Sequence, residues 1–218
     1  MEVFHSNRLS ESDFDQILTV LRAGGVIGFP TDTAYGLGAD PFNESAVDRI
    51  FKIKGRAEAK PILLIVSSRS MVEQVAKPNA VFERVADAFW PGPLTIILPA
   101  APSVPRKVTA GGSTIGLRLP DAPFARRLAE GLGRPLTATS ANRSDMPAPV
   151  TAEEVRVQLG DSLEMLDILV DGGGRLPARS GSSLLDLTAD PPVLLREGPI
   201  SFARLQEFFA GRLRRSLA

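Results

Sequence analysis

Residues 26–40 read VIGFPTDTAYGLGAD, an apolar run that ends at a proline and passes into a polar, glycine-containing segment. The run Val26–Pro30 predicts a buried strand, and the polar segment Thr31–Asp40 predicts an exposed loop. Ahead of this stretch, residues 10–22 combine a serine cap with apolar positions on one face, as in a surface helix. Behind it, residues 44–54 repeat the helical spacing. The order helix, strand, loop, helix indicates an α/β fold.

The same alternation continues to the end of the chain. We expect strands over 62–66, 94–98, 114–119, 135–139, 168–170, 183–187 and 193–196, and helices over 81–90, 123–130, 153–159 and 202–213. Strands and helices that alternate through short Gly/Pro loops favour one α/β domain with a mixed sheet, here residues 1–218. No linker divides it, and no internal repeat is present.

Composition excludes several kinds of chemistry. The 218 residues carry 25 basic and 25 acidic side chains, no cysteine, and a single histidine, His5. Disulfides, cysteine nucleophiles and thiolate metal sites are thus excluded, and His5 falls in first residues that we expect to be mobile. A Ser-His-Asp triad is therefore not expected. No apolar run reaches the roughly 18–20 residues that span a bilayer, and the start has no apolar signal region. These features predict a cytoplasmic protein without a membrane segment.

Polar clusters at the ends of apolar runs are the candidate binding sites, because open α/β sheets bind ligands there. Thr31–Gly38 offers hydroxyls and backbone amides, although an ordinary turn has the same composition. Lys54, Arg56 and Lys60 place three cations at a helix C-terminus. A solvated, dipole-complementing helix end is the alternative there.

Three further clusters follow along the chain. Arg118 alternates with leucines on a strand, so it either binds an anionic ligand or has a structural place, as an internal salt bridge or at an exposed edge. Ser140 and Asn142 follow a strand of small residues and either contact a ligand or cap the next segment. The serines of 180–183 with Arg196 form either a fifth cluster or a flexible hairpin.

Together these clusters supply cations, hydroxyls and amides but no evident nucleophile. Such an inventory suits the binding of a polyanion, and phosphoryl chemistry asks a protein mainly for positioning and charge stabilisation, usually with Mg²⁺. A Walker sequence and a complete dinucleotide fingerprint are both missing from the chain. The residues alone therefore predict a nucleotide or phosphate site.

Five motifs, in this order, give the chain a resemblance to a known family. They are PTDTAYGLG at 30–38, KGR at 54–56, PGPLT at 91–95, SAN at 140–142 and SSLLD at 182–186. The chain resembles the YrdC-like L-threonylcarbamoyladenylate synthases from about Ser12 to about Pro199. That resemblance implies a twisted mixed α/β sheet flanked by helices, with a large, positively lined cavity and a C-terminal helix over 200–218.

The resemblance also implies an activity. L-threonine, bicarbonate and ATP, with Mg²⁺, would be condensed to threonylcarbamoyl-AMP and pyrophosphate. Partner proteins would then transfer the threonylcarbamoyl group to the tRNA adenosine beside the anticodon, and the enzyme itself would bind tRNA only weakly. Such a nucleotidyltransferase needs no protein nucleophile, because the threonine carbamate attacks the α-phosphorus and orientation supplies much of the acceleration.

Site residues carry over from the family by motif. The ATP side would comprise Lys54, Arg56, Lys60, Ser140, Asn142 and Arg196. The threonine side would comprise Thr33, Arg118, Ser182, Thr114 and Ala138. Three positions depart from the family pattern: Ala57, where many members have proline, Ile65, where many have histidine, and Asp145, where many have glycine. No metal ligand is assigned.

Two other functions remain open at this point. One is an RNA-binding module for tRNA or ribosomal RNA, with Arg204, Arg212, Arg214 and Arg215 contributing to a basic face. The other is a related enzyme that carbamoylates a different acceptor. A solvated helix end is the alternative explanation of the four arginines.

Overall fold

The computed structural model describes residues 1–55, 60–144, 146–177 and 181–216. Capping residues in the sequence account for where its first two long helices begin and for where the second ends. Helix α1 (Glu11–Arg22) starts at Ser10, which shares a reciprocal capping box with Asp13. Helix α2 (Glu44–Lys54) starts at Asn43 and ends at Gly55, whose φ of 56° is left-handed. Both helices confirm the prediction, and Lys54 lies in the last helical position.

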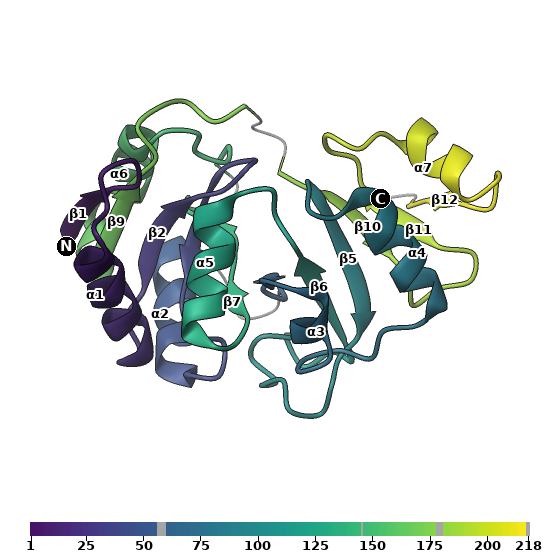
Figure 1. Ribbon diagram of the computed structural model, residues 1–218, viewed down its shortest axis with the longest axis horizontal. Helices are drawn as coiled ribbons and strands as arrows, with labels where there is room; N and C mark the ends of the chain where they lie inside the picture. The colour runs from purple at the N-terminus through teal and green to yellow at the C-terminus, as the bar shows by residue number, and fades with distance from the viewer. Residues whose placement is uncertain (56–59, 145, 178–180, 217–218) are drawn as a thin grey trace.

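A five-stranded sheet forms the N-terminal side of the molecule (Figure 1). Its strands, in spatial order, are β1 (Glu2–His5), β9 (Ile168–Asp171), β2 (Ile27–Pro30), β3 (Tyr35–Gly38) and β8 (Thr139–Ser140). Strand β9 is parallel to both neighbours, and β3 is antiparallel to β2 and β8. The first residues therefore form a strand, and the prediction of a mobile segment around His5 is wrong.

Strand β3 overturns the prediction of an exposed loop over 31–40. All four of its residues are buried. A Cβ at Gly38 would lie 2.8 Å from a ring carbon of Phe29, and one at Gly36 would lie 3.4 Å from that ring. The glycines that suggested a loop instead leave room for an aromatic ring on a buried strand.

A seven-stranded mixed sheet forms the other side. Its strands, in spatial order, are β12 (Arg214–Arg215), β11 (Val193–Arg196), β10 (Ser183–Asp186), β5 (Leu94–Pro99), β6 (Thr114–Arg118), β4 (Leu64–Ile65) and β7 (Leu136–Thr137). Strand β10 is parallel to β5 and antiparallel to β11. The parallel pairing brings the start of β10 beside the start of β5, with Ser183 opposite Leu94.

The single sheet expected from the sequence is thus two sheets. The expected strand over 135–139 divides at Ala138, since β7 pairs with β4 and β8 pairs with β3. Ala138 itself donates a backbone hydrogen bond to the Leu63 carbonyl at 2.8 Å. Small residues at this point let the chain pass from one sheet directly into the other.

Helices surround both sheets (Figure 1). The remaining helical elements are α3 (Arg69–Val72), α4 (Ala80–Phe89), α5 (Pro123–Leu132), α6 (Ala152–Leu159), the 3₁₀ helix η1 (Gly160–Met165) and α7 (Phe202–Phe208). Helix α5 contacts β2 of one sheet and β4 and β7 of the other. No helix in the described part of the chain is long and apolar enough to span a membrane.

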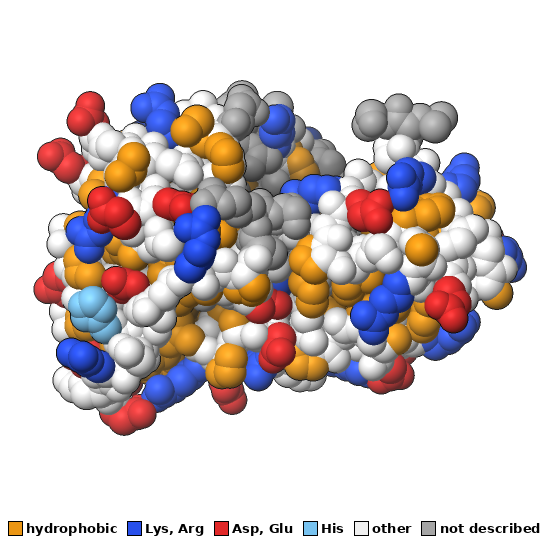
Figure 2. Space-filling model, turned by 90° about the horizontal axis from the view of Figure 1, so that it is seen from above, with side chains coloured by type: hydrophobic (Ala, Val, Ile, Leu, Met, Phe, Trp, Pro, Cys, Tyr) orange, Lys and Arg blue, Asp and Glu red, His pale blue; other side chains and the backbone are white. Residues whose placement is uncertain are grey.

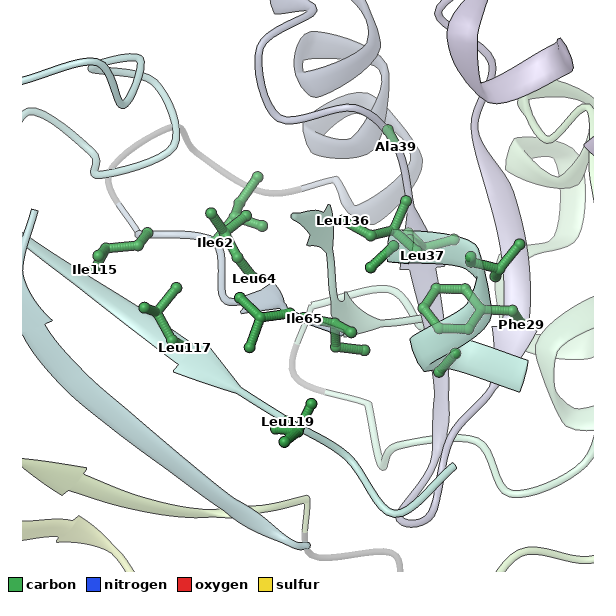
Figure 3. Packing of buried hydrophobic residues seen from close by; sticks show 14 of the residues in the cluster. Phe29, Leu37, Ala39, Ile62, Leu64, Ile65, Ile115, Leu117, Leu119 and Leu136 are labelled. Atoms are coloured by element: carbon green, nitrogen blue, oxygen red, sulfur yellow. The ribbon is translucent and has the colours of Figure 1, made fainter. Parts of the chain in front are cut away.

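One hydrophobic core continues across the two sheets (Figure 3). Phe29 and Leu37 from the five-stranded sheet lie on one side, and Leu117 from the seven-stranded sheet lies on the other, with Leu136 and Ile65 between them. All five side chains are at most 1% exposed. This shared packing fixes the loops that leave the strand ends of the two sheets relative to one another.

The C-terminal helix is shorter than predicted. Helix α7 ends at Phe208, whereas the sequence suggested a helix over 202–213 and a helical end over 200–218. Ala210 and Gly211 have φ values of 50° and 83°, and a right-handed helix cannot continue through residues with positive φ. The chain then returns as strand β12, parallel to β11.

Candidate functional site

A cavity of about 690 Å³ lies between the two sheets and takes its walls from both. The five-stranded sheet contributes Gly36 and Ser140, and the seven-stranded sheet contributes Thr95, Arg118 and Leu184. The predicted site residues that line it are Thr33, Lys54, Lys60, Thr114, Arg118, Ala138, Ser140, Asn142, Ser182 and Arg196. Arg56 lies outside the described residues.

Basic side chains dominate the charge of this cavity. Its described lining includes Lys54, Lys60, Arg118 and Arg196 and has no aspartate or glutamate. Ligand pockets in proteins commonly measure about 300–1,000 Å³. The cavity is large enough for a nucleotide together with a small molecule, and its charge suits an anion.

Lys54 reaches the cavity from the last turn of α2 and holds the segment that follows β8. Its side chain is 4% exposed. Nζ donates to the carbonyl oxygen of Ser140 at 2.6 Å, and to the carbonyl oxygen and Oδ1 of Asn142 at 3.0 and 2.9 Å. All three of these acceptors belong to Ser140 and Asn142, at and just beyond the end of β8. In this structure Lys54 therefore fixes the position of Ser140 and Asn142 in the cavity wall.

Ser140 and Asn142 also form hydrogen bonds of their own, in addition to those that they accept from Lys54. Ser140 Oγ donates to Asn142 Oδ1 at 2.6 Å, and Asn142 Nδ2 donates to the Met146 carbonyl. Asn142 is 5% exposed, so its amide is fixed rather than rotating in solvent. The bond from Asn142 Nδ2 to the Met146 carbonyl also holds the next segment, as the capping alternative expected, whereas the next helix, α6, begins only at Ala152 and is capped by Thr151.

Arg118 is 8% exposed and forms the internal salt bridge that was one alternative for its role, so it does not occupy an exposed edge position. Its guanidinium forms an internal ion pair with Asp32 at 2.5 Å, and it also donates to Thr33 Oγ1 at 2.9 Å and the Gly92 carbonyl at 3.1 Å. A guanidinium carries five N–H donors, which leaves two beyond these three bonds. Burial lowers the pKa of Arg118, and the carboxylate of Asp32 acts in the opposite direction.

Arg196 and Ser182 meet at the seven-stranded sheet, where β11 ends beside the start of β10. Arg196 Nε and Nη2 donate to the Ser182 carbonyl at 3.0 and 2.9 Å. The arginine as a whole is exposed, yet its guanidinium has a lowered pKa, first through burial and then through the positive charge of Arg118. An anionic ligand near both arginines would offset that repulsion.

The remaining predicted residues occupy the rim and the sheet junction. Lys60 is exposed, Thr114 is half-buried at the start of β6, and Ala138 lies where the chain crosses between sheets. Ile65, which departs from the family pattern, is 1% exposed and lines the cavity from β4. Ala57 and Asp145, the other two departures, lie outside the described residues.

Sequence reasoning assigned no role to two polar residues of the site. Asp32 lies in the first quoted motif and pairs with Arg118, a partner that any buried arginine requires. Thr95 lies in the PGPLT motif and contacts Ser182 Oγ at 2.6 Å. Their motifs were visible in the sequence, but the pairings depend on how distant strands align.

The C-terminal arginines are engaged in local contacts. Arg215 pairs with Glu197 at 2.8 Å and lies over the Phe202 ring, Arg212 pairs with Asp190 at 3.5 Å, and Arg204 lies over the Phe89 ring. Figure 2 shows one face of the molecule, on which acidic and basic side chains are interspersed. Arg204 lies within α7, but Arg212, Arg214 and Arg215 lie beyond its end at Phe208, so the explanation as a solvated helix end is wrong for these three.

Comparisons with known proteins agree with this geometry. The Sua5/YciO/YrdC family model, described as "Telomere recombination", matches residues 19–198. A Pyrococcus abyssi protein named threonylcarbamoyl-AMP synthase is 40% identical over 191 residues, which are 86% of this chain and 54% of that protein. A Bacillus subtilis protein of the same name is 37% identical over 207 residues, 92% of this chain and 58% of that protein. The chain spans little more than half the length of these two relatives.

Solved structures show the same likeness. The chain superimposes on P. abyssi Sua5 complexed with L-threonine with a TM-score of 0.88 at 36% identity, covering 99% of this chain and 62% of that one. Escherichia coli YciO gives a TM-score of 0.80 at 29% identity, covering 91% and 95% of the two chains. With most of its length matched by the family model, this chain belongs to the Sua5/YciO/YrdC family.

Proposed function

We propose that this chain is an L-threonylcarbamoyladenylate synthase, a nucleotidyltransferase that condenses L-threonine, bicarbonate and ATP to threonylcarbamoyl-AMP and pyrophosphate. One observation carries the proposal: every described residue that the resemblance assigns to ATP or threonine lines the same basic cavity. The relatives named for this activity and the threonine complex of P. abyssi Sua5 add support.

The chemistry requires positioning more than reactive side chains. The threonine amine and bicarbonate combine to a carbamate with release of water, and a carbamate oxygen then attacks the α-phosphorus of ATP. The bond from the α-phosphorus to the bridging oxygen breaks, and pyrophosphate leaves. Negative charge accumulates on the phosphate oxygens in this step, so fixed cations in a partly dehydrated cavity stabilise it.

The described residues divide naturally between the two substrates. Arg118 retains two N–H donors for the threonine carboxylate while Asp32 holds its guanidinium in place. Thr33 and Ser182 add hydroxyls on the same side. Arg196 and Lys60, with Arg56, would face the phosphates, and Ser140 and Asn142 would contact the nucleotide from the segment that Lys54 holds.

Magnesium fits this site only as a companion of ATP. Among the described residues no group of three or more histidine or carboxylate side chains could hold a metal ion. Mg²⁺ typically binds through substrate phosphates with a few protein oxygens and retained waters. We therefore propose that Mg²⁺ enters bound to the ATP phosphates, where it would neutralise phosphate charge.

The product implies partners. A mixed anhydride of a carbamate and AMP is a reactive donor, so a second protein must pass its threonylcarbamoyl group to the tRNA adenosine beside the anticodon. We propose that this hand-over occurs in the cytoplasm, where charged and uncharged tRNAs are found. Direct contact of this chain with tRNA would be weak, because the net charge of the chain is zero.

Product formation tests the proposal directly. The purified protein is incubated with ATP, Mg²⁺, bicarbonate and L-threonine, and pyrophosphate and the mass of threonylcarbamoyl-AMP are measured with each component omitted in turn. We expect product only in the complete mixture. Arg118→Gln should raise the threonine requirement, whereas Arg134→Gln, which alters a surface ion pair with Asp40, should not.

Two results would contradict the proposal. ATP binding without product, or product with homoserine or serine in preference to threonine, would indicate a different acceptor. Absence of ATP binding together with salt-sensitive binding of tRNA would favour the RNA-binding module.

A further inference from the structure

Thr95 is a fully buried polar residue beside the threonine side of the cavity. It lies on β5 and is 0% exposed, yet it contributes to the cavity wall. Its Oγ1 lies 2.6 Å from Ser182 Oγ, and its methyl group faces Gly116, where a Cβ would come within 3.3 Å. The hydroxyl is thus held toward Ser182 by packing on its other side.

The surroundings determine which hydroxyl donates. Within the described chain, Thr95 Oγ1 has Ser182 as its sole hydrogen-bond partner. If Ser182 donated, the Thr95 proton would be a buried donor without an acceptor, an arrangement that folded proteins avoid. Thr95 therefore donates, and Ser182 Oγ accepts.

This direction leaves the Ser182 proton available to the cavity. A second donor, Arg196 Nη2, approaches Ser182 Oγ at 3.5 Å, so the described neighbours of that oxygen are donors. The Ser182 carbonyl is at the same time held by Arg196 Nε and Nη2. The carbonyl oxygen and Oγ of Ser182 are consequently fixed, and the Ser182 hydroxyl proton is left to donate to a ligand.

We infer that Thr95 is a positioning residue for the amino-acid substrate, because it sets Ser182 as a hydrogen-bond donor toward an anionic oxygen of that substrate. The inference rests on the proposed function and extends it to a residue that acts through Ser182. A carboxylate or carbamate oxygen accepts such a bond, and an amine does not. The Thr95–Ser182 pair would thus select the orientation in which the anionic end of the amino acid meets this wall.

The test compares two substitutions that differ only in the hydroxyl and the methyl group. Thr95→Val keeps the shape and removes the donor, and Thr95→Ser keeps the donor. We expect Thr95→Val to weaken L-threonine binding, measured by calorimetry, about tenfold and to raise the KM for threonine with little change in that for ATP. Thr95→Ser should recover most of that loss. Thr109→Val, at a buried threonine outside the cavity, controls for the general cost of losing a buried hydroxyl.

A double-mutant cycle shows whether Thr95 acts through Ser182. In a Ser182→Ala background, Thr95→Val should cause no further loss of threonine binding. Additive losses, or a Thr95→Val protein that binds threonine within twofold of the parent while Ser182→Ala does not, would overturn the inference. Failure of the unmodified protein to bind L-threonine would instead overturn the proposed function, and the inference with it. Melting temperatures of all variants establish that each is folded.

Discussion

Replacement of Lys54 by methionine tests whether this residue supports the fold of the site. Lys54→Met removes the ammonium group and keeps an unbranched side chain. Two of the three acceptors retain another donor, since the Ser140 carbonyl also accepts from Asn142 N at 2.9 Å and Asn142 Oδ1 accepts from Ser140 Oγ at 2.6 Å. The Asn142 carbonyl, which accepts from Nζ at 3.0 Å, would keep no hydrogen bond to the described residues.

These contacts set the expected magnitude. Loss of one of two hydrogen bonds costs about 1 kcal/mol for each of the first two acceptors, and an orphaned buried carbonyl costs about 1–3 kcal/mol. The free energy of unfolding should therefore fall by about 3–5 kcal/mol. A lysine whose role was confined to binding phosphate would leave the unliganded protein as stable as before.

Urea unfolding of the ligand-free protein, followed by Trp90 fluorescence and circular dichroism, measures this change. Lys60→Met is the matched control, because Lys60 lines the same cavity but is exposed. Its unfolding free energy should stay within about 0.5 kcal/mol of the parent. A Lys54→Met protein within about 1 kcal/mol of the parent would refute the supporting role.

Three further expectations concern other parts of the molecule. Asp32→Ala should lower the unfolding free energy by about 3 kcal/mol, measured in urea, because it leaves the buried guanidinium of Arg118 without its carboxylate. Gly198→Ala should lower the melting temperature and impair threonine binding, because the added Cβ would lie 2.7–2.8 Å from the backbone entering β10. Ser10→Ala should raise the pKa of Asp13 toward 3.8, as measured by NMR titration, because the two hydrogen bonds from Ser10 lower that pKa. The stability that this capping box contributes is full above pH 3.8 and is lost as the pH falls through the pKa of Asp13 in the folded protein.

Local signals predicted most of the helices well, apart from the C-terminal end of α7, and some of the strands poorly. Helix α2 matches its predicted bounds because Asn43 and Gly55 specify its ends independently of the rest of the fold. Strand β3 was missed because its glycines suggested a loop. They instead make room for the ring of Phe29, which lies on the neighbouring strand β2. Strand β1 has no buried residue that would reveal it, and it exists because β9 offers a free edge.

For the site, too, the residues could be predicted from local sequence, whereas their contacts with residues distant in the sequence could not. Residue types and motifs were enough to predict which polar side chains would gather. Their partners were not predictable, because the Arg118–Asp32 and Thr95–Ser182 contacts depend on the pairing of strands far apart in the sequence. That Lys54 would hold the segment after β8 likewise required knowing where that segment returns.

The position of β1 in its sheet has a consequence for how the protein is made. Glu2 pairs with Ile168, so β1 finds its neighbour only after β9, far along the chain, has been synthesised. Strand β2 also waits for β9, with which it pairs from Ile27 onward. Such distant pairing slows folding, and unpaired strand edges in nascent chains invite aggregation. We therefore expect the five-stranded sheet to close only after β9 has been synthesised, and until then its unpaired strands would be substrates for chaperones.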